Sequence, residues 1–432
     1  MKLSNISERR FTEKDLFLLF FIVWLLAAGC QNTEEAPSVP DGFNVHPANS
    51  NTPYKNVLNY CIGQKYPSQS RSLRTLPLIG QVTDNPGVED IMNRVLVSHD
   101  WMANNFRTLL SLLPADILEL FKATTGVVIS SDIRPAYYNP QTGAIYIDPA
   151  YIWLTNDEKL TISNQKDSRS DYGKTLKFVP LWRYVKDKKY AYSGTDWTKQ
   201  YNRTVDDVKI GLAHLLYHEL SHANDYFPPP LIKTINLDQT VQSAAYSLEN
   251  ERADVKISRN SSIRLSSSVL FTLSNVLYGG MQPGSAENGY SPDTVSFELK
   301  KEPANDMYNF YGVEDIAMVF EEVMLHYHYG IDRQMAITKM PAVQNPTAAD
   351  YVISWGQKNR FMDDRLKPKA IEITKLLLPK YDLSGFINSL GKATEMVKNT
   401  TWADTMYIYK TLLPPPDTRL SNDILLINYS MK

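Results

Sequence analysis

The chain contains very little cysteine, with 2 cysteines among 432 residues. At most one disulfide can form, so a small framework held together by disulfides is excluded. A surplus of charge is also absent, because 45 Lys and Arg stand against 47 Asp and Glu. Nucleic-acid-binding domains usually carry a basic surplus, and we therefore expect no nucleic-acid partner. The chain has no glycine-rich phosphate loop, dinucleotide fingerprint or G-x-S-x-G elbow, so none of these motifs supplies a nucleotide site or a serine nucleophile.

One long apolar run is present, Leu16–Gly29, and its 14 residues are fewer than a membrane span needs. Such a run suits the apolar centre of a secretory signal. It ends Leu26-Ala-Ala-Gly-Cys30 and resembles the bacterial lipoprotein signal, in which a lipidated cysteine becomes the new N-terminus. We expect residues 1–29 to be a lipoprotein signal peptide and Cys30 to carry the lipid. The alternative is a single membrane-anchoring helix with an incidental cysteine.

The chain after the cysteine divides by composition into a tether and one large domain. Residues 30–55 are polar and contain several prolines, which predicts a flexible, lipid-anchored tether. Residues 56–432 show no further linker and no repeat, so we expect a single domain there. Gln31 follows the lipidated cysteine, and the resemblance then favours the outer membrane of the bacterial envelope, facing the periplasm or the cell surface. Cys61 is left without a partner, and we expect it to be packed rather than reactive.

Apolar periodicity predicts a small β portion followed by many helices. Helical spacing covers 88–113 and 116–123, whereas 126–130, 143–147 and 175–183 are typical of strands. From Val205 to about residue 400 the pattern is largely helical. The expected fold class is therefore α+β and mostly α, with a small sheet first and a helical C-terminal part.

The motif that indicates chemistry is His218-Glu-Leu-Ser-His222, an H-E-x-x-H sequence. Four residues advance a helix by about 400°, so the two histidines lie on one stripe and can bind one ion. Glu219 then lies beside the position where a water molecule would bind. His214 lies on the same stripe two turns from His222, and we interpret it as a neighbour rather than a ligand. Asp225 returns to this stripe, where its carboxylate is predicted to orient a ligand ring.

The helix that carries the motif is predicted to be buried on one side. The apolar residues on the face opposite the histidines are Leu212, Leu216, Leu220 and Ala223. This pattern packs one face in the core and presents the motif on the other.

This motif resembles that of the zincin metallopeptidases, which implies a zincin-like catalytic domain holding Zn²⁺. The metzincin pattern requires a histidine or aspartate six residues after His222, and Pro228 stands there. The remaining resemblance is to gluzincins, in which a glutamate from a later helix is the third ligand. Two candidates are open. Glu251 lies in a segment similar to the glutamate helix of several gluzincins. Glu314 begins a Glu-Asp-x-Ala segment similar to that of lethal-factor-like proteins.

The helical wheel favours Glu314 over the runner-up Glu251. The Glu314 stripe also holds Ala317, Met318, Glu321 and Leu325. An ionised carboxylate in such apolar surroundings needs a cation or strong donors. The neighbours of Glu251 are polar on most sides, so its carboxylate can simply face water.

The resemblance also implies a mechanism and a way of binding substrate. Zinc would activate a water molecule, Glu219 would act as general base, and a tyrosine before the glutamate ligand would stabilise the oxyanion. Tyr308 and Tyr311 are the candidates for that last role. Zincins usually bind peptide as an added strand on a sheet edge, and the segment 143–147 is our candidate edge.

The predicted function is a membrane-anchored zinc metallopeptidase that hydrolyses peptide bonds of a peptide or protein substrate in the cell envelope. The main alternative is a non-catalytic envelope lipoprotein that uses a zincin-like fold as a binding module. A weaker alternative is an interaction scaffold. The presence of Glu219 favours the enzyme, because a structural zinc site does not need a general base.

Overall fold

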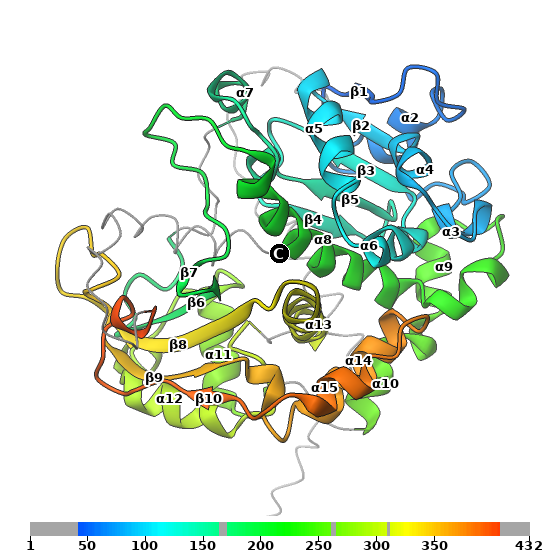
Figure 1. Ribbon diagram of the computed structural model, residues 1–432. Coiled ribbons are helices and arrows are strands. Elements are labelled where there is room, and N and C mark those ends of the chain that lie inside the picture. The colour runs from blue at the N-terminus through cyan, green and yellow to red at the C-terminus, as the bar shows by residue number, and fades with distance from the viewer. Residues whose placement is uncertain (1–41, 164–170, 261–264, 309–311, 407–432) are drawn as a thin grey trace, which may run out of the picture. The chain divides into compact units, whose positions relative to one another are not determined.

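A computed structural model describes residues 42–163, 171–260, 265–308 and 312–406. The described chain from Gly42 onward belongs to one compact unit. It mixes helices with two five-stranded sheets (Figure 1). Within these ranges, no helix has both the length and the apolar character needed to cross a membrane. The predicted signal peptide and Cys30 lie outside the described residues.

The first sheet is built from the N-terminal part of the described chain. Its strand order is β1-β2-β3-β5-β4, and the strands span His46–Pro47 (β1), Val95–Val97 (β2), Gly126–Ile129 (β3), Ala144–Ile147 (β5) and Tyr137–Asn139 (β4). The three central strands are parallel, and the two edge strands run antiparallel to their neighbours. The predicted strands at 126–130 and 143–147 are confirmed. The predicted edge is wrong, because β5 lies inside the sheet and β4 forms the edge.

Alternating side chains of the first sheet enter two different cores. Val127 and Ile145 join the main core, which includes the motif helix. Val128 and Tyr146 face a smaller core with Leu58 of helix α2 (Leu58–Ile62). Successive side chains of a strand point to opposite faces, which explains this division.

The predicted helix over 88–113 is interrupted by a strand. The structure has α4 (Val88–Met92), then β2, then α5 (Asp100–Leu110). The Val-Leu-Val run of β2 is fully buried and pairs with β3 on one side and β1 on the other. Pairing in the sheet therefore overrides the helical spacing around this short β-branched run. The helix predicted over 116–123 is present as α6 (Ala115–Leu120) and one further 3₁₀ turn.

The second sheet joins segments that are far apart in the sequence. Its order is β10-β9-β8-β6-β7, and all its pairings are antiparallel. The strands span Thr394–Glu395 (β10), Ile353–Lys358 (β9), Asp332–Lys339 (β8), Phe178–Lys186 (β6) and Lys189–Tyr190 (β7). The strand predicted at 175–183 is confirmed as β6. From Val205 to about residue 400 the described chain is largely helical, as predicted, but it also contains the strands β8, β9 and β10, which were not predicted.

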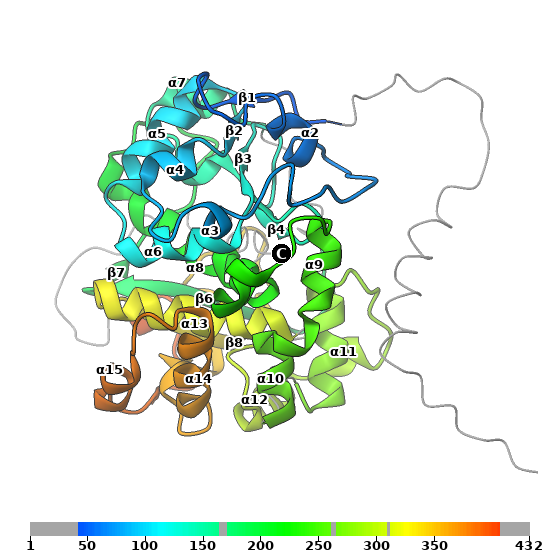
Figure 2. The same cartoon turned by 90° about the vertical axis from the view of Figure 1, so that its right-hand side faces the viewer.

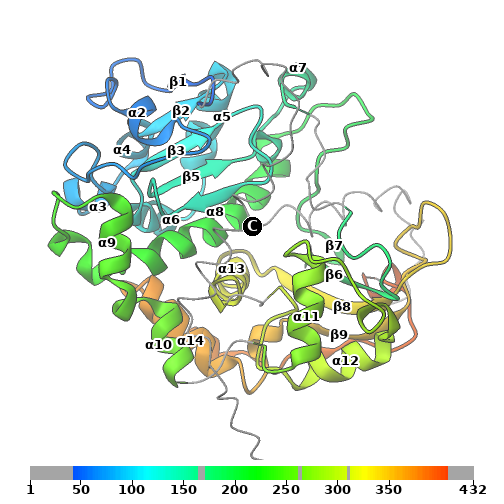
Figure 3. The same ribbon diagram turned by 180° about the vertical axis from the view of Figure 1, so that it is seen from behind.

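Two long helices lie between the sheets and carry the candidate site. Helix α8 (Val205–Tyr226) packs against β4 and β5 of the first sheet, and α13 (Gly312–Tyr329) packs against both α8 and β8. Figures 1 and 3 show this layering from opposite sides. Seen from the side in Figure 2, the remaining helices surround these layers. They are α3 (Ile79–Val82), α7 (Asn156–Leu160), α9 (Val241–Ser247), α10 (Ala253–Asn260), α11 (Ser268–Leu277), α12 (Pro292–Lys301), α14 (Lys367–Leu377) and α15 (Ser384–Ser389).

The predicted tether ends earlier than residue 55. His46 and Pro47 pair with β2 as the edge strand β1. The hydroxyl of Thr52 donates to the backbone carbonyl of Asn93, and the guanidinium of Arg94 lies 3.6 Å from the centre of the Tyr54 ring. Residues 42–55 are therefore part of the folded unit.

Candidate metal centre

Helix α8 places the H-E-x-x-H motif in the interior. The helix begins with a capping box, in which Thr204 accepts from the Asp207 N–H and the Asp207 carboxylate accepts from the Thr204 N–H. It ends before Phe227 and a run of prolines, which cannot continue a helix. The apolar face predicted from Leu212, Leu216, Leu220 and Ala223 is fully buried, as expected. The opposite face is buried too, so the prediction that it is presented outward is wrong.

Helix α13 brings Glu314 to the histidine pair. The start of this helix is held by Asp315, whose carboxylate accepts a hydrogen bond of 2.6 Å from the backbone N–H of Asn305. The segment before it is held by Arg360, which is buried and donates to the carbonyls of Leu299, Glu302 and Ala304. Arg360 belongs to no predicted site, and it positions the chain that leads into α13.

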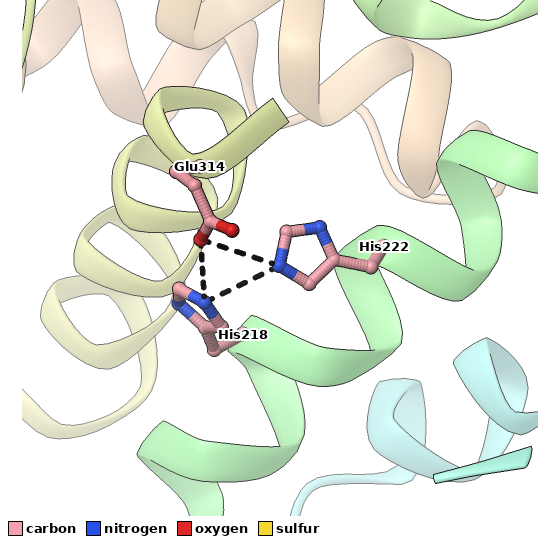
Figure 4. A group of neighbouring side chains, drawn as sticks. All are labelled: His218, His222 and Glu314. Carbon is pink, nitrogen blue, oxygen red and sulfur yellow. Dashed lines mark hydrogen bonds and ion pairs between the residues drawn. The ribbon is translucent and has the colours of Figure 1, made fainter. Parts of the chain in front are cut away.

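Three ligand atoms converge between the two helices. The Nε2 atoms of His218 and His222 lie 3.3 Å apart. Glu314 Oε2 lies 3.4 Å from His218 Nε2 and 3.6 Å from His222 Nε2. Figure 4 shows the three side chains pointing toward one another from α8 and α13. Within the described residues, this is the one set of three His, Cys, Asp or Glu side chains that converges closely enough to hold a metal ion.

The size of this triangle fits a tetrahedral zinc ion. Zinc bonds to nitrogen and oxygen are about 2.0–2.1 Å, so two ligands of a tetrahedral ion lie about 3.3–3.4 Å apart. The three distances between ligand atoms are close to this value. In addition, Glu314 Oε2 is buried and has no hydrogen-bond partner within the described chain. A buried carboxylate oxygen in that condition needs a positive charge nearby.

The tautomer of His218 adds to this requirement. Its Nδ1 lies 2.8 Å from Oε2 of Glu321, a carboxylate that can only accept, so Nδ1 carries the proton and donates. When His218 carries no second proton, its Nε2 directs a lone pair toward His222 and Glu314. Two nitrogen atoms and a carboxylate facing one another need a cation at their centre, either a metal ion or a proton.

The pKa values of the site reflect the same charges. Burial alone would raise the pKa of Glu314, but the imidazoles of His222 and His218 lower it to about 2. Burial opposes protonation of His218, yet Glu321 and Glu314 outweigh it and raise the His218 pKa well above its usual value. The pKa shifts of Glu314 and His218 show that the cluster favours a positive charge beside the Glu314 carboxylate, which a proton on His218 or a metal ion can supply.

Glu219 has the surroundings of a general base. Its side chain is buried, and neither of its carboxylate oxygens has a hydrogen-bond partner among the described residues. Burial raises the pKa of Glu219, and the two motif histidines oppose this rise. A raised carboxylate pKa suits a group that takes up and releases a proton near neutral pH.

Several residues predicted for the site lie elsewhere. Glu251 pairs with Lys256 at 2.9 Å on the surface and does not belong to the converging set. Asp225 accepts hydrogen bonds from Arg252 and from the backbone N–H of Asp254, so the expectation that it orients a histidine ligand is wrong. Asp225 lies on the predicted helical stripe, but its carboxylate is bound by the buried guanidinium of Arg252.

Of the two tyrosines predicted to bind the oxyanion, the structure describes only Tyr308. Tyr308 is buried, and its ring meets Tyr278 edge-on with 4.8 Å between ring centres. Tyr311 lies outside the described residues. Their catalytic role stays a prediction.

Glu321 was not predicted as a site residue, although it lies on the Glu314 stripe of the helical wheel. It lies seven residues, or two helical turns, after Glu314, which brings it back to the same side of α13. His214 lies one turn before His218 on α8 and contacts Glu321 rather than the converging set.

Comparison of the chain with protein-family models, with curated proteins and with solved structures finds no significant match. The residues of the site therefore carry the whole functional argument.

Proposed function

We propose that this chain is a zinc-dependent metallopeptidase of gluzincin type. His218, His222 and Glu314 would hold the ion, and Glu219 would act as general base. The observation that carries this proposal is the convergence of three ligand atoms at tetrahedral spacing beside a buried, unpartnered carboxylate. A structural site needs the ligands but not the adjacent base, which favours the enzyme over a zinc-stabilised binding module.

The chemistry follows from the roles of the chain's own groups. Zinc, when bound, supplies a lowered pKa for a coordinated water molecule and polarisation of a carbonyl. Glu219 takes a proton from the attacking water on a carboxylate oxygen and gives it to the leaving amine nitrogen. The apolar, buried surroundings keep bulk water from the Glu219 carboxylate and raise its pKa for this exchange.

The edge strand β4 is the proposed place for the substrate. This strand pairs with β5 on one side and lies at the end of the sheet order. Helix α8 packs against β4, so the strand runs along the helix that carries the proposed general base Glu219. A peptide added along β4 would bring its backbone to the proposed reaction centre by β-augmentation. This assignment replaces the segment 143–147 expected from the sequence.

The proposed location is the bacterial cell envelope, with lipid on Cys30 as the anchor. The support is the sequence Leu26-Ala-Ala-Gly-Cys30 after an apolar run. We propose the outer membrane as the site, because Gln31 follows the cysteine.

The deciding experiment combines zinc content with hydrolysis. We expect the purified full chain to hold about one zinc ion and to cleave members of a mixed peptide library. Glu219→Gln should keep the zinc and the fold while hydrolysis falls by a factor on the order of 10²–10⁴. Zinc without any cleavage would favour the alternative, a non-catalytic envelope lipoprotein that serves as a binding module. A chain that takes up no zinc after reconstitution would contradict the proposal itself.

A further inference from the structure

The side chains between α8 and α13 alternate beyond the three converging ligands. Their order is His222, Glu314, His218, Glu321 and His214, and each one contacts the next. The first half comprises the contacts of Glu314 with the two motif histidines, at 3.6 and 3.4 Å. In the second half, Glu321 lies 2.8 Å from His218 Nδ1 and 3.2 Å from His214 Nε2. Each glutamate thus lies between two histidines, and His218 belongs to both halves.

The second half is completed by hydrogen-bond donors. The hydroxyl of Tyr184 on β6 donates to Glu321 Oε1 at 2.8 Å. The hydroxyl of Tyr192 lies 3.0 Å from Nδ1 of His214, and the rings of Tyr184 and Trp182 flank the same imidazole. Glu321 is 1 % exposed. Its carboxylate is therefore buried, and protein groups surround it on both oxygens.

The two halves differ in what they can hold. Within the described residues, only the first half brings three ligand atoms together. The two histidines that flank Glu321 do not meet it at a common point. In the second half the Glu321 carboxylate is instead held by hydrogen bonds from the Tyr184 hydroxyl and His218 Nδ1.

From this arrangement we infer that Glu321 is a positioning residue for the metal centre. Its hydrogen bond fixes the proton of His218 on Nδ1 and sets the plane of the ring, which leaves Nε2 free to bind. Tyr184 and His214 hold Glu321 in turn, so the orientation of one ligand depends on both α8 and the second sheet. The inference rests on the proposed function for the identity of the ion. The hydrogen bond between Glu321 and His218 does not depend on it.

The test compares Glu321→Ala with a matched control at the next position. Glu322→Gln changes an equally buried carboxylate of α13, neither of whose oxygens has a hydrogen-bond partner within the described residues. Removing an outer-shell partner of a ligand typically weakens metal binding by about 10- to 100-fold. We expect that loss of zinc affinity for Glu321→Ala in competition with a chelator, and unchanged affinity for Glu322→Gln. Tyr184→Phe removes one donor to Glu321 without touching His218, and we expect a loss of a few-fold.

A second measurement reports on His218 without any metal. In metal-free protein labelled with ¹⁵N-histidine, the proton on His218 Nδ1 should give a strongly hydrogen-bonded resonance, and Glu321→Ala should shift it. A general structural role for Glu321 would not move this signal selectively. Tyr184→Phe should shift it less, and it provides the comparison if Glu321→Ala does not fold.

The outcomes separate the two proposals. Unchanged zinc affinity in folded Glu321→Ala, or an equal loss in Glu322→Gln, overturns the positioning role. Wild-type protein that binds no zinc contradicts the proposed function, and the His218 resonance then decides the hydrogen bond alone. If the wild type binds no zinc and the His218 resonance is the same with and without the Glu321 carboxylate, the positioning role of Glu321 is overturned as well.

Discussion

The carboxylate of Asp225 binds Arg252, with 2.9 Å between Oδ2 and Nη2, in the interior just beyond the H-E-x-x-H motif. Arg252 is buried, with its guanidinium 3.9 Å from the centre of the Tyr226 ring, and it also forms an ion pair with Asp254 at 3.1 Å. Asp225 thus stabilises the end of α8 and the start of α10. Its position in the sequence is instead typical of a residue that orients a metal-ligating histidine.

Asp225→Ala should destabilise the fold and spare the metal. Removing one partner of a buried ion pair leaves the other charge uncompensated, which costs about 3–5 kcal/mol. We expect that decrease in the free energy of unfolding in urea, with zinc content per folded molecule unchanged. Asp238→Ala is the control, because it breaks an exposed ion pair with Arg74 and should leave the free energy of unfolding nearly unchanged. Normal stability with loss of zinc would restore Asp225 as a residue that supports a ligand.

Glu314→Ala should remove the zinc, whereas Glu251→Ala should not. Glu314 supplies one of the three converging ligand atoms, and Glu251 forms a surface ion pair with Lys256. Loss of an outer-shell partner weakens metal binding by up to about 100-fold. Loss of Glu314, a direct ligand, should weaken zinc binding by more than that. Metal analysis after dialysis against a weak chelator measures the difference. Full zinc content in Glu314→Ala would show that another residue is the third ligand.

Stability should decrease as pH rises through the range in which Glu322 ionises. Burial raises the pKa of Glu322 from 4.5 to about 7, although Arg333 opposes the shift. Between these two pH values the folded chain binds more protons than the unfolded chain, so the free energy of unfolding falls as pH rises. Above pH 7 both states are ionised, and the cost stays at up to about 3 kcal/mol.

Glu322→Gln removes this titration while keeping the shape of the side chain. We expect the variant to gain stability over the wild type progressively between pH 4.5 and 7, in urea unfolding series at several pH values. The exposed Glu249→Gln serves as the comparison and should show no such trend. A stability difference that is the same at every pH would contradict the assigned pKa.

Cys30 should carry lipid in the protein extracted from membranes. The signal-like run before it predicts cleavage after Gly29 and acylation of the new N-terminus. Mass spectrometry of the N-terminal peptide should find the acylated form beginning at Cys30, and Cys30→Ser should retain residues 1–29. An intact Met1 terminus in the wild type would mean that the apolar run is an anchoring helix instead.

The residues that converge on the proposed metal site could be chosen from the sequence because local periodicity constrains them. His218, Glu219 and His222 share less than two turns of one helix, so their relative positions follow from helix geometry alone. Glu314 could be chosen over Glu251 only from the residues around it. The apolar stripe on its side of the helix correctly indicated that its carboxylate is buried. These arguments use only neighbours along one helix.

Predictions that depended on distant partners were the ones that failed. The run 95–97 forms a strand because β1 and β3 are there to pair with it, and β8 forms a strand because β6 lies beside it. Glu321 gains its role from Tyr184, a residue of that same β6. Asp225 is diverted by Arg252, which lies 27 residues further along the chain. Periodicity within one segment carries no information on such contacts.

The separation of the ligands along the chain has a consequence for biogenesis. Glu314 follows His222 by 92 residues, and the helix that carries it packs against β8, which comes later still. A nascent chain whose synthesis has passed His222 but not Glu314 contains only two of the three proposed ligands and lacks the carboxylate. The complete coordination set arises only after translation has passed residue 314 and the second sheet has begun to form. Metal loading of the proposed site would therefore be a late step in maturation, and truncation products that end before α13 would lack the third ligand.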